Sequence, residues 1–277
     1  MRKFYFLLVF IFISCTSNAQ QTDIFSVENT WKYAQYLENT GQSELAVAEY
    51  ERILFLNPAL DSVRFRILSI LVKEGKYDYA FKKSAWYLPS YSQQSCIGKL
   101  KHTKLFLLSG KPDSSVSFYQ RAACFDTASN YFVRTCSLLM KYQVKEAKLN
   151  FLNTSLSIRN QYPEISPMFD DSLMIRHRSP FVSGLLSAVI PGTGKIYSGR
   201  WRDGMYSLII IASNAFSSYR YFDKNGKSSV GGWVFASIGT GFYLGNIFGS
   251  VKAARIFNRN EKDRYKHSLQ RRIAASF

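Results

Sequence analysis

Histidine is scarce in this chain of 277 residues, with three copies at His102, His177 and His267. They lie in different segments, so no pair has the spacing of metal ligands or of a catalytic triad. The sequence also lacks a nucleophile elbow and a pair of carboxylates placed for acid–base chemistry. We therefore expect no enzyme activity, no metal and no cofactor.

Cysteine is also rare, with four copies. One of them, Cys15, falls in an N-terminal segment that we expect to be removed, which leaves Cys96, Cys124 and Cys136. This odd number without metal-type spacing predicts buried small hydrophobes. One pair could still oxidise outside the cytoplasm.

Acidic residues are few, since 19 Asp and Glu stand against 36 Lys and Arg, a net charge of +17. That balance fits nucleic-acid binding, an anionic membrane surface, or basic loops that set membrane topology. Hydrophobic residues make up 47% of the chain, which argues against disorder. Basic residues gather in residues 254–277, directly after an apolar stretch, and such a cluster is most often a topological anchor. We expect membrane lipid among the partners and no nucleic acid.

The N-terminus is basic at Arg2 and Lys3, apolar over residues 4–13, and small at Ser17 and Ala19. This order predicts a bacterial-type secretory signal peptide over residues 1–19. Export would place the following domain outside the cytoplasm.

Two alternatives to a cleaved signal stay open. Cys15 could be the lipidated cysteine of a lipoprotein, although Phe12 stands where a Leu-like residue is usual. An uncleaved anchor is disfavoured because the apolar run is too short to span a bilayer.

Three glycines, Gly41, Gly75 and Gly110, each occupy a short polar turn after an apolar stretch with helical period. They are 34 and 35 residues apart, which indicates an internal repeat. Ala46 and Ala80 follow the first two glycines by five residues, where a second helix must pass close to the first. The pattern predicts stacked helical hairpins.

The matching positions in the first unit are Leu37, Gly41, Ala46, Tyr50, Ile53 and Pro58. In the next two units they are Leu71, Gly75 and Ala80, and then Phe106, Gly110, Tyr119 and Ala122. These residues resemble the tetratricopeptide repeat, and a weaker fourth unit has Tyr142 in place of the turn glycine. The resemblance implies an all-α solenoid over residues 24–158 that binds a protein partner on its concave surface.

The repeat register assigns seven residues of the first helices to that surface. They are Trp31, Gln35, Glu38, Phe65, Ser69, Leu100 and Lys104. The alternative is that Trp31 and Phe65 are core or edge residues of their helices.

Proline and charge break the pattern over residues 159–180, which we interpret as a linker. Beyond it, residues 181–253 hold three apolar stretches, and the last, residues 230–251, is uncharged and long enough to span a bilayer. Its glycines are typical of close helix packing in lipid, either within the chain or in a homo- or hetero-oligomer.

A turn motif separates the first two apolar stretches. Its residues are Pro191, Gly192, Gly194, Tyr197, Gly199 and Gly204. The motif resembles a signature of the small two-transmembrane-helix domain family, in which it marks a tight interfacial turn without chemistry. A nucleotide-binding loop is excluded, because Val189 and Ile196 stand where that loop needs glycine and Ser or Thr.

The signal and the basic tail constrain topology together. If the repeats are outside and the tail is inside, an odd number of crossings is required. Three spans, with residues 181–197 as the first, satisfy both, and a half-inserted first helix with two crossings is the alternative.

The function predicted by these features is a scaffold for protein–protein interaction, anchored in a bacterial membrane, the inner one by our interpretation. The alternative is an accessory subunit of a membrane transport or envelope-assembly complex. A membrane-embedded enzyme is a third hypothesis, disfavoured because the middle and last apolar stretches have no ionisable residue at their centres.

Overall fold

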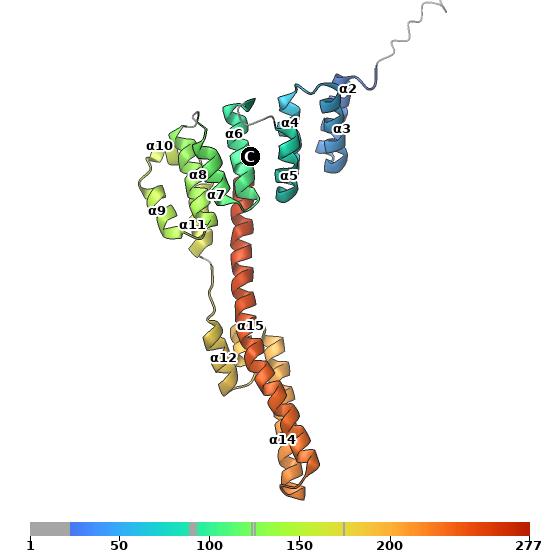
Figure 1. Ribbon diagram of the computed structural model, residues 1–277, viewed down its shortest axis with the longest axis vertical. Helices are drawn as coiled ribbons and strands as arrows, with labels where there is room; N and C mark the ends of the chain where they lie inside the picture. Colours follow the sequence, from blue (N-terminus) through green and yellow to red (C-terminus); the bar gives the residue numbers. More distant parts are fainter. Residues whose placement is uncertain (1–22, 89–92, 123, 125, 174) are drawn as a thin grey trace, which may run out of the picture. The chain divides into compact units, whose positions relative to one another are not determined.

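The computed structural model describes residues 23–277 except 89–92, 123, 125 and 174 (Figure 1). The described residues are all-helical, as the sequence predicts. The expected signal peptide, residues 1–19, lies outside the described residues. The chain divides into two compact units, residues 1–105 with Phe277 and residues 106–276, and the division falls within α6 (Cys96–Leu108).

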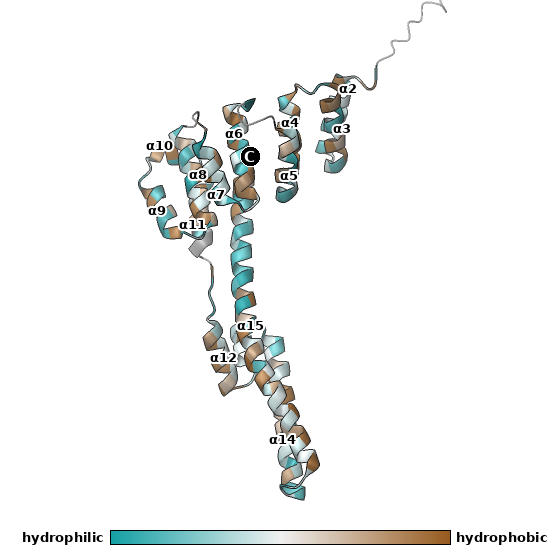
Figure 2. Cartoon of the chain, viewed as in Figure 1, coloured by the Kyte–Doolittle hydropathy of each residue, from teal (hydrophilic) through white to brown (hydrophobic). Residues whose placement is uncertain are grey.

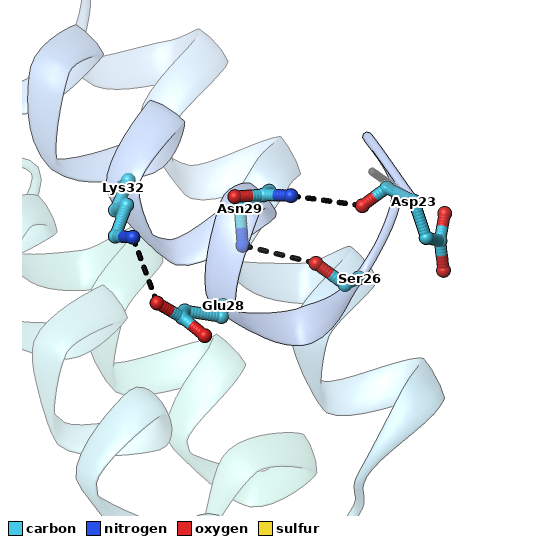
Figure 3. A network of polar contacts seen from close by, with 5 residues as sticks. All are labelled: Asp23, Ser26, Glu28, Asn29 and Lys32. Carbon is cyan, nitrogen blue, oxygen red and sulfur yellow. Dashed lines mark hydrogen bonds and ion pairs between the residues drawn. The ribbon is translucent and has the colours of Figure 1, made fainter. Parts of the chain in front are cut away.

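The first described helix, α2 (Val27–Asn39), begins at a side-chain cap (Figure 3). The Ser26 hydroxyl accepts the backbone N–H of Asn29 at 3.3 Å, and the Asn29 side chain donates to the Asp23 carbonyl at 2.9 Å. The first bond satisfies one of the backbone donors that a helix start leaves unpaired, and the second ties the helix to the residues before it. Glu28 and Lys32 add an exposed ion pair one turn apart at 2.7 Å.

The repeat is visible in a turn that recurs four times. Gly41, Gly75 and Gly110 have φ of +77°, +71° and +72°, and Tyr142 adopts φ +61° at the fourth position. In each turn the N–H of the next residue bonds back to a carbonyl five residues earlier, as Gln42 does to Leu37 at 2.8 Å. This is a left-handed helix cap, which favours glycine. The sequence-predicted turn positions are therefore correct, including that of Tyr142.

The first unit holds α2 with α3 (Ser43–Leu56) and α4 (Asp61–Lys73) with α5 (Tyr77–Tyr87). Each helix packs on the next along the chain. Ala46 and Ala80 are fully buried, as expected for small residues between crossing helices. Tyr50 and Ile53 complete the core of the first pair.

The second unit continues with α7 (Pro112–Gln120), α8 (Thr127–Met140) and α9 (Val144–Leu152). Two further helices, α10 (Leu156–Arg159) and α11 (Ile165–Leu173), occupy much of the segment interpreted as a linker. Ile165 and Met168 of α11 are fully buried. Most of residues 159–173 therefore belongs to the packed helices.

The expected first span, residues 181–197, is not one helix. It forms α12 (Pro180–Val189) and the short α13 (Thr193–Tyr197), separated by a turn in which Gly192 has φ +90°. Ten helical residues rise only about 15 Å, half of a bilayer core. The Tyr197 hydroxyl accepts the N–H of Ser179 at 3.3 Å, so the segment ends at the level where it began. The break at Gly192 therefore replaces the single helix expected over residues 181–197, and the pattern of apolar residues did not reveal it.

The last two helices form an antiparallel hairpin. α14 (Trp201–Asn225) and α15 (Val230–Ala275) are joined by a turn at Gly226 and remain in contact from Ser218 and Gly232 near the tip to Asn214 and Gly239. α15 has 46 residues, and at 1.5 Å per residue it is about 69 Å long. Its N-terminal part pairs with α14, and its C-terminal part extends beyond the hairpin.

The C-terminal part of α15 packs against the repeat helices of its own unit. The side-chain amide of Gln270 donates to the Leu108 carbonyl at 2.5 Å, and the Tyr142 hydroxyl donates to the Lys262 carbonyl at 3.2 Å. α8 and α11 also contact α15. The basic tail and these repeats therefore lie together, which contradicts the expectation that a membrane separates them.

Candidate functional site

Two of the predicted surface residues, Trp31 and Glu38, pack between helices of the first unit. Trp31 meets Tyr50 edge to face, with ring centroids 5.5 Å apart. Glu38 accepts from Arg66 Nε at 2.8 Å and from the Tyr50 hydroxyl at 3.4 Å, which joins α2 to α3 and α4. Trp31 and Glu38 therefore link successive helices and are only partly available to a partner. Gln35 is half-buried on the same helix.

The other four predicted residues belong to α4 and α6. Phe65 lies against Gly98, where an added Cβ would be 3.0 Å from the ring, and Ser69 donates to the Phe65 carbonyl at 2.8 Å. Leu100 is half-buried, whereas Lys104 is only 5% exposed. We therefore leave Lys104 out of the candidate surface.

Aromatic side chains that the repeat register did not single out are more exposed. Trp86 on α5 and Phe55 on α3 are each 85% exposed. Tyr33 and Tyr36 on α2 stack on one another, with centroids 6.5 Å apart, and both face solvent. Exposed Trp and Tyr side chains are the usual anchors of protein interfaces. They could have been identified from the sequence as aromatic residues at helix positions that lie outside the buried apolar stripe.

A groove of about 400 Å³ also lies between α3, α4 and α5. Its charged residues pair across it, Glu44 with Lys76 at 2.7 Å and Glu51 with Lys83 at 3.5 Å. The hydroxyl of Tyr87 also bonds to Glu51. These pairs satisfy the charges internally, so the groove offers little to a charged ligand.

His102 lies at a packing position of α6, half-buried, with Nδ1 3.5 Å from the Gln94 side-chain nitrogen. Burial lowers the pKa of its imidazole to about 4. A free histidine titrates near 6.5, so protons bind the unfolded chain first as the pH falls.

We expect the contribution of His102 to the free energy of unfolding to be constant above about pH 7, to fall as the pH drops from about 6.5 to 4, and to level off below. The loss is about 3 kcal/mol. Chemical unfolding of the purified chain at several pH values measures it, and His102→Gln removes this component. An unchanged pH profile in that variant would show that His102 is not the group responsible.

The cysteines divide into two kinds. Cys136 is a fully buried free thiol, as predicted, while Cys96 and Cys124 are disulfide-bonded. Disulfides persist in oxidising compartments outside the cytoplasm. Of the two expectations for these residues, oxidation therefore fits Cys96 and Cys124 better than the role of small buried hydrophobes.

The predicted turn motif brings backbones into close contact. Gly192 lies so close to the Gly204 carbonyl that a Cβ would overlap it, and Gly194 is equally close to the Ser183 carbonyl. Tyr197 carries the hydroxyl that accepts from Ser179, and Arg178 lies over its ring at 4.8 Å. The motif therefore holds α12, α13 and α14 together.

The remaining two motif residues differ from these glycines. Gly199 has φ +82°, and a Cβ added to it would lie 3.8 Å from the Phe257 ring. Pro191 is half-buried in the turn. Neither contributes a group that could react, so the role of the motif is structural.

The interior between α12, α13 and α15 is polar. The Ser183 hydroxyl donates to the carbonyls of Gly194 and Ser250, both at 2.8 Å, and Ser187 bonds to the Ser250 hydroxyl at 2.7 Å. All three serines are fully buried. Further out, the Tyr243 hydroxyl donates to the Ala188 carbonyl at 2.7 Å.

Hydrophobic residues recur along α12, α14 and α15 (Figure 2), and several of them are exposed. Phe181 and Val189 of α12, Phe216 of α14, and Val230 and Phe248 of α15 are each more than 60% exposed. Among the described residues, α15 is the helix that is long and apolar enough to cross a membrane. A water-soluble domain buries apolar groups and exposes polar ones, whereas these helices do the reverse.

Among the described residues, no three His, Cys, Asp or Glu side chains are grouped so that they could hold a metal ion. Comparison with known protein families, with curated proteins and with solved structures found no match to this chain.

Proposed function

We propose that this protein is a membrane-anchored scaffold whose tetratricopeptide-like repeat domain binds a protein partner outside the cytoplasm. The observation that carries the proposal is the fourfold left-handed turn at Gly41, Gly75, Gly110 and Tyr142, each between two helices. Regular helical hairpins of this kind stack into a solenoid that presents a broad binding surface. No catalytic group is required.

The anchor in this proposal crosses the bacterial inner membrane twice. The N-terminal part of α15 forms one crossing, and α14, whose uncharged stretch covers only residues 204–219, pairs with it to form the other. The buried serines and exposed aromatic and aliphatic side chains support that placement. α12 and α13 enter only halfway and return. Serine hydroxyls bonded to carbonyls satisfy the polar groups that such a reversal leaves inside the membrane.

Two crossings return the basic tail to the side of the repeats. The signal peptide and the disulfide-bonded Cys96 and Cys124 support an external position for both. The hairpin tip is then cytoplasmic, with Arg220, Lys224 and Lys227 against Asp223. The more basic tail is external in this proposal, held there by its contacts with the repeat helices.

Photo-crosslinking in intact cells, followed by detergent purification, tests the scaffold. We expect a recurrent protein partner whose yield falls about tenfold in Trp86→Ala, because an exposed Trp contributes roughly 1.4 kcal/mol or more at an interface. Lys82→Ala, an exposed change on the same helix, is the control and should keep the yield. If the full-length chain captured no recurrent partner, the scaffold proposal would be contradicted. If Trp86→Ala and Lys82→Ala gave equal yields, the binding surface would not include Trp86.

A further inference from the structure

An open groove of about 870 Å³ lies between α13, α14 and α15. One end is charged, with Lys195 of α13, Arg200 at the start of α14, and Lys252 of α15. The other end is apolar, with Ile210 of α14 and Ile238 of α15. The groove belongs to one compact unit of the chain.

The charge at the first end is only partly compensated within the protein. Arg200 pairs with Asp203 at 2.5 Å, whereas Lys195 donates to the neutral hydroxyl of Ser207 at 2.6 Å. Among the described residues, neither Lys195 nor Lys252 has an acidic partner within 4 Å. Two ammonium groups are therefore available to an anion.

The lining changes from charged to apolar along the helix. Ile238 and Lys252 are 14 residues apart on α15, which is about 21 Å at 1.5 Å per residue. α14 runs in the opposite direction, so Arg200 lies at the level of the charged end and Ile210 toward the apolar end. A small anion would need only the first few ångströms of such a groove, whereas a molecule with a charged head and a long apolar chain would use all of it.

Glycines make the groove deep. A Cβ placed on Gly241 or Gly245 would meet no atom within 4 Å, so these residues do not serve helix packing inside the chain. Gly232 and Gly239 of the same helix do, because they lie against Phe222 and Asn214. The close helix packing expected from the sequence therefore holds for Gly232 and Gly239. Gly241 and Gly245 instead leave an open channel along α15.

A buried polar atom lies between the two ends. Asn246 lines the groove and is 3% exposed, and its side-chain nitrogen donates to the Ser187 carbonyl at 3.4 Å. Its Oδ1 has no hydrogen-bond partner in the protein. This polar position marks the boundary between the charged end of the groove and its apolar end.

We propose that the groove binds an anionic phospholipid. Its phosphate lies between Lys195 and Lys252, and one acyl chain follows Gly245 and Gly241 toward Ile238. The proposal uses the membrane placement of the hairpin and is independent of what the repeats bind. A helix from a second copy would fill the glycine channel but would leave the ammonium groups without an anion.

Lipid retention measured by native mass spectrometry tests the apolar half. The full chain is purified in detergent from nanodiscs of phosphatidylglycerol and phosphatidylcholine in equal amounts. We expect retained phosphatidylglycerol to exceed phosphatidylcholine about tenfold, and Gly241→Leu with Gly245→Leu to lower its retention about tenfold by filling the channel. Ser237→Leu, an exposed change on the same helix outside the groove, should leave retention unchanged.

The charged half has its own pair of variants. Lys252→Gln should lower phosphatidylglycerol retention severalfold, while Arg255→Gln removes an equal charge from the same helix outside the groove and should have little effect. These surface changes keep the fold even if the leucine variants do not. Equal retention of the two lipids, equal effects of Lys252→Gln and Arg255→Gln, or displacement of the lipid by excess inorganic phosphate would each overturn the proposal.

Discussion

Gly194→Ala is expected to abolish accumulation of the folded membrane unit. The backbone of α13 passes so close to α12 that the added methyl group would overlap the Ser183 carbonyl oxygen and crowd the Ser187 hydroxyl. Backbone cannot move aside as a flexible side chain can, so α12 and α13 must separate. Separation would also leave the buried Ser183 hydroxyl without the Gly194 carbonyl, and the buried Ser187 hydroxyl without the Gly194 N–H that donates to it.

The expected cost is about 4 kcal/mol or more, the range reached when a buried network is broken. Detergent-extracted yield and thermal unfolding measure it. Gly245→Ala makes the same chemical change where the new methyl group meets open space, and it should be neutral or slightly stabilising because alanine favours helix. If Gly194→Ala matched Gly245→Ala, the described packing of α12 on α13 would be wrong.

Leu269→Asp is expected to detach the end of α15 from the repeat helices. Leu269 is 1% exposed, and its neighbours Tyr265 and Ile273 on the same face are also buried. Loss of the leucine contacts and burial of a carboxylate together cost about 4 kcal/mol or more. The stretch of α15 beyond the hairpin should then become open to protease.

Limited proteolysis of the full chain in detergent measures that change. Arg271→Asp introduces the same residue two positions away on the exposed face and should leave the tail protected. Rapid cleavage of both variants, or of neither, would mean that the buried face of α15 does not hold the tail.

The repeats could be predicted from sequence because their signals are local. A left-handed turn requires glycine or a tolerated substitute, and the spacing of Gly41, Gly75 and Gly110 reported this directly. Tyr142 was predictable only from the register. Its conformation is supported by contacts distant in sequence, with the Tyr265 ring 5.9 Å away and its hydroxyl on Lys262.

The arrangement of the C-terminal third could not be predicted in the same way. Hydropathy reports the length of an apolar run, whereas the reversal after α12 depends on Gly192 and Gly194 fitting against distant backbone. The paired hydrogen bonds between Asn258 and the backbone of Arg178, both 2.8 Å, likewise join residues 80 positions apart. Neither the close glycine contacts nor these hydrogen bonds produce a periodic pattern of residues in the sequence.

The position of the basic tail could not be predicted from its charge alone. Positive charge next to a span indicates the cytoplasm on average, and the sequence offered no reason to set that rule aside. The buried face formed by Tyr265, Leu269 and Ile273 has helical spacing, but periodicity alone does not say which surface covers it. The contacts with Leu108 and Tyr142 supply that information.

The most direct test of the account is the accessibility of three engineered cysteines in spheroplasts. Lys82→Cys marks the repeats, Arg271→Cys the tail and Lys224→Cys the hairpin tip, each in a chain with Cys136→Ala, and a membrane-impermeant maleimide labels them. We expect Lys82→Cys and Arg271→Cys to react in intact spheroplasts, and Lys224→Cys to react only after permeabilisation. Labelling of Lys82→Cys and Arg271→Cys from opposite sides would contradict it.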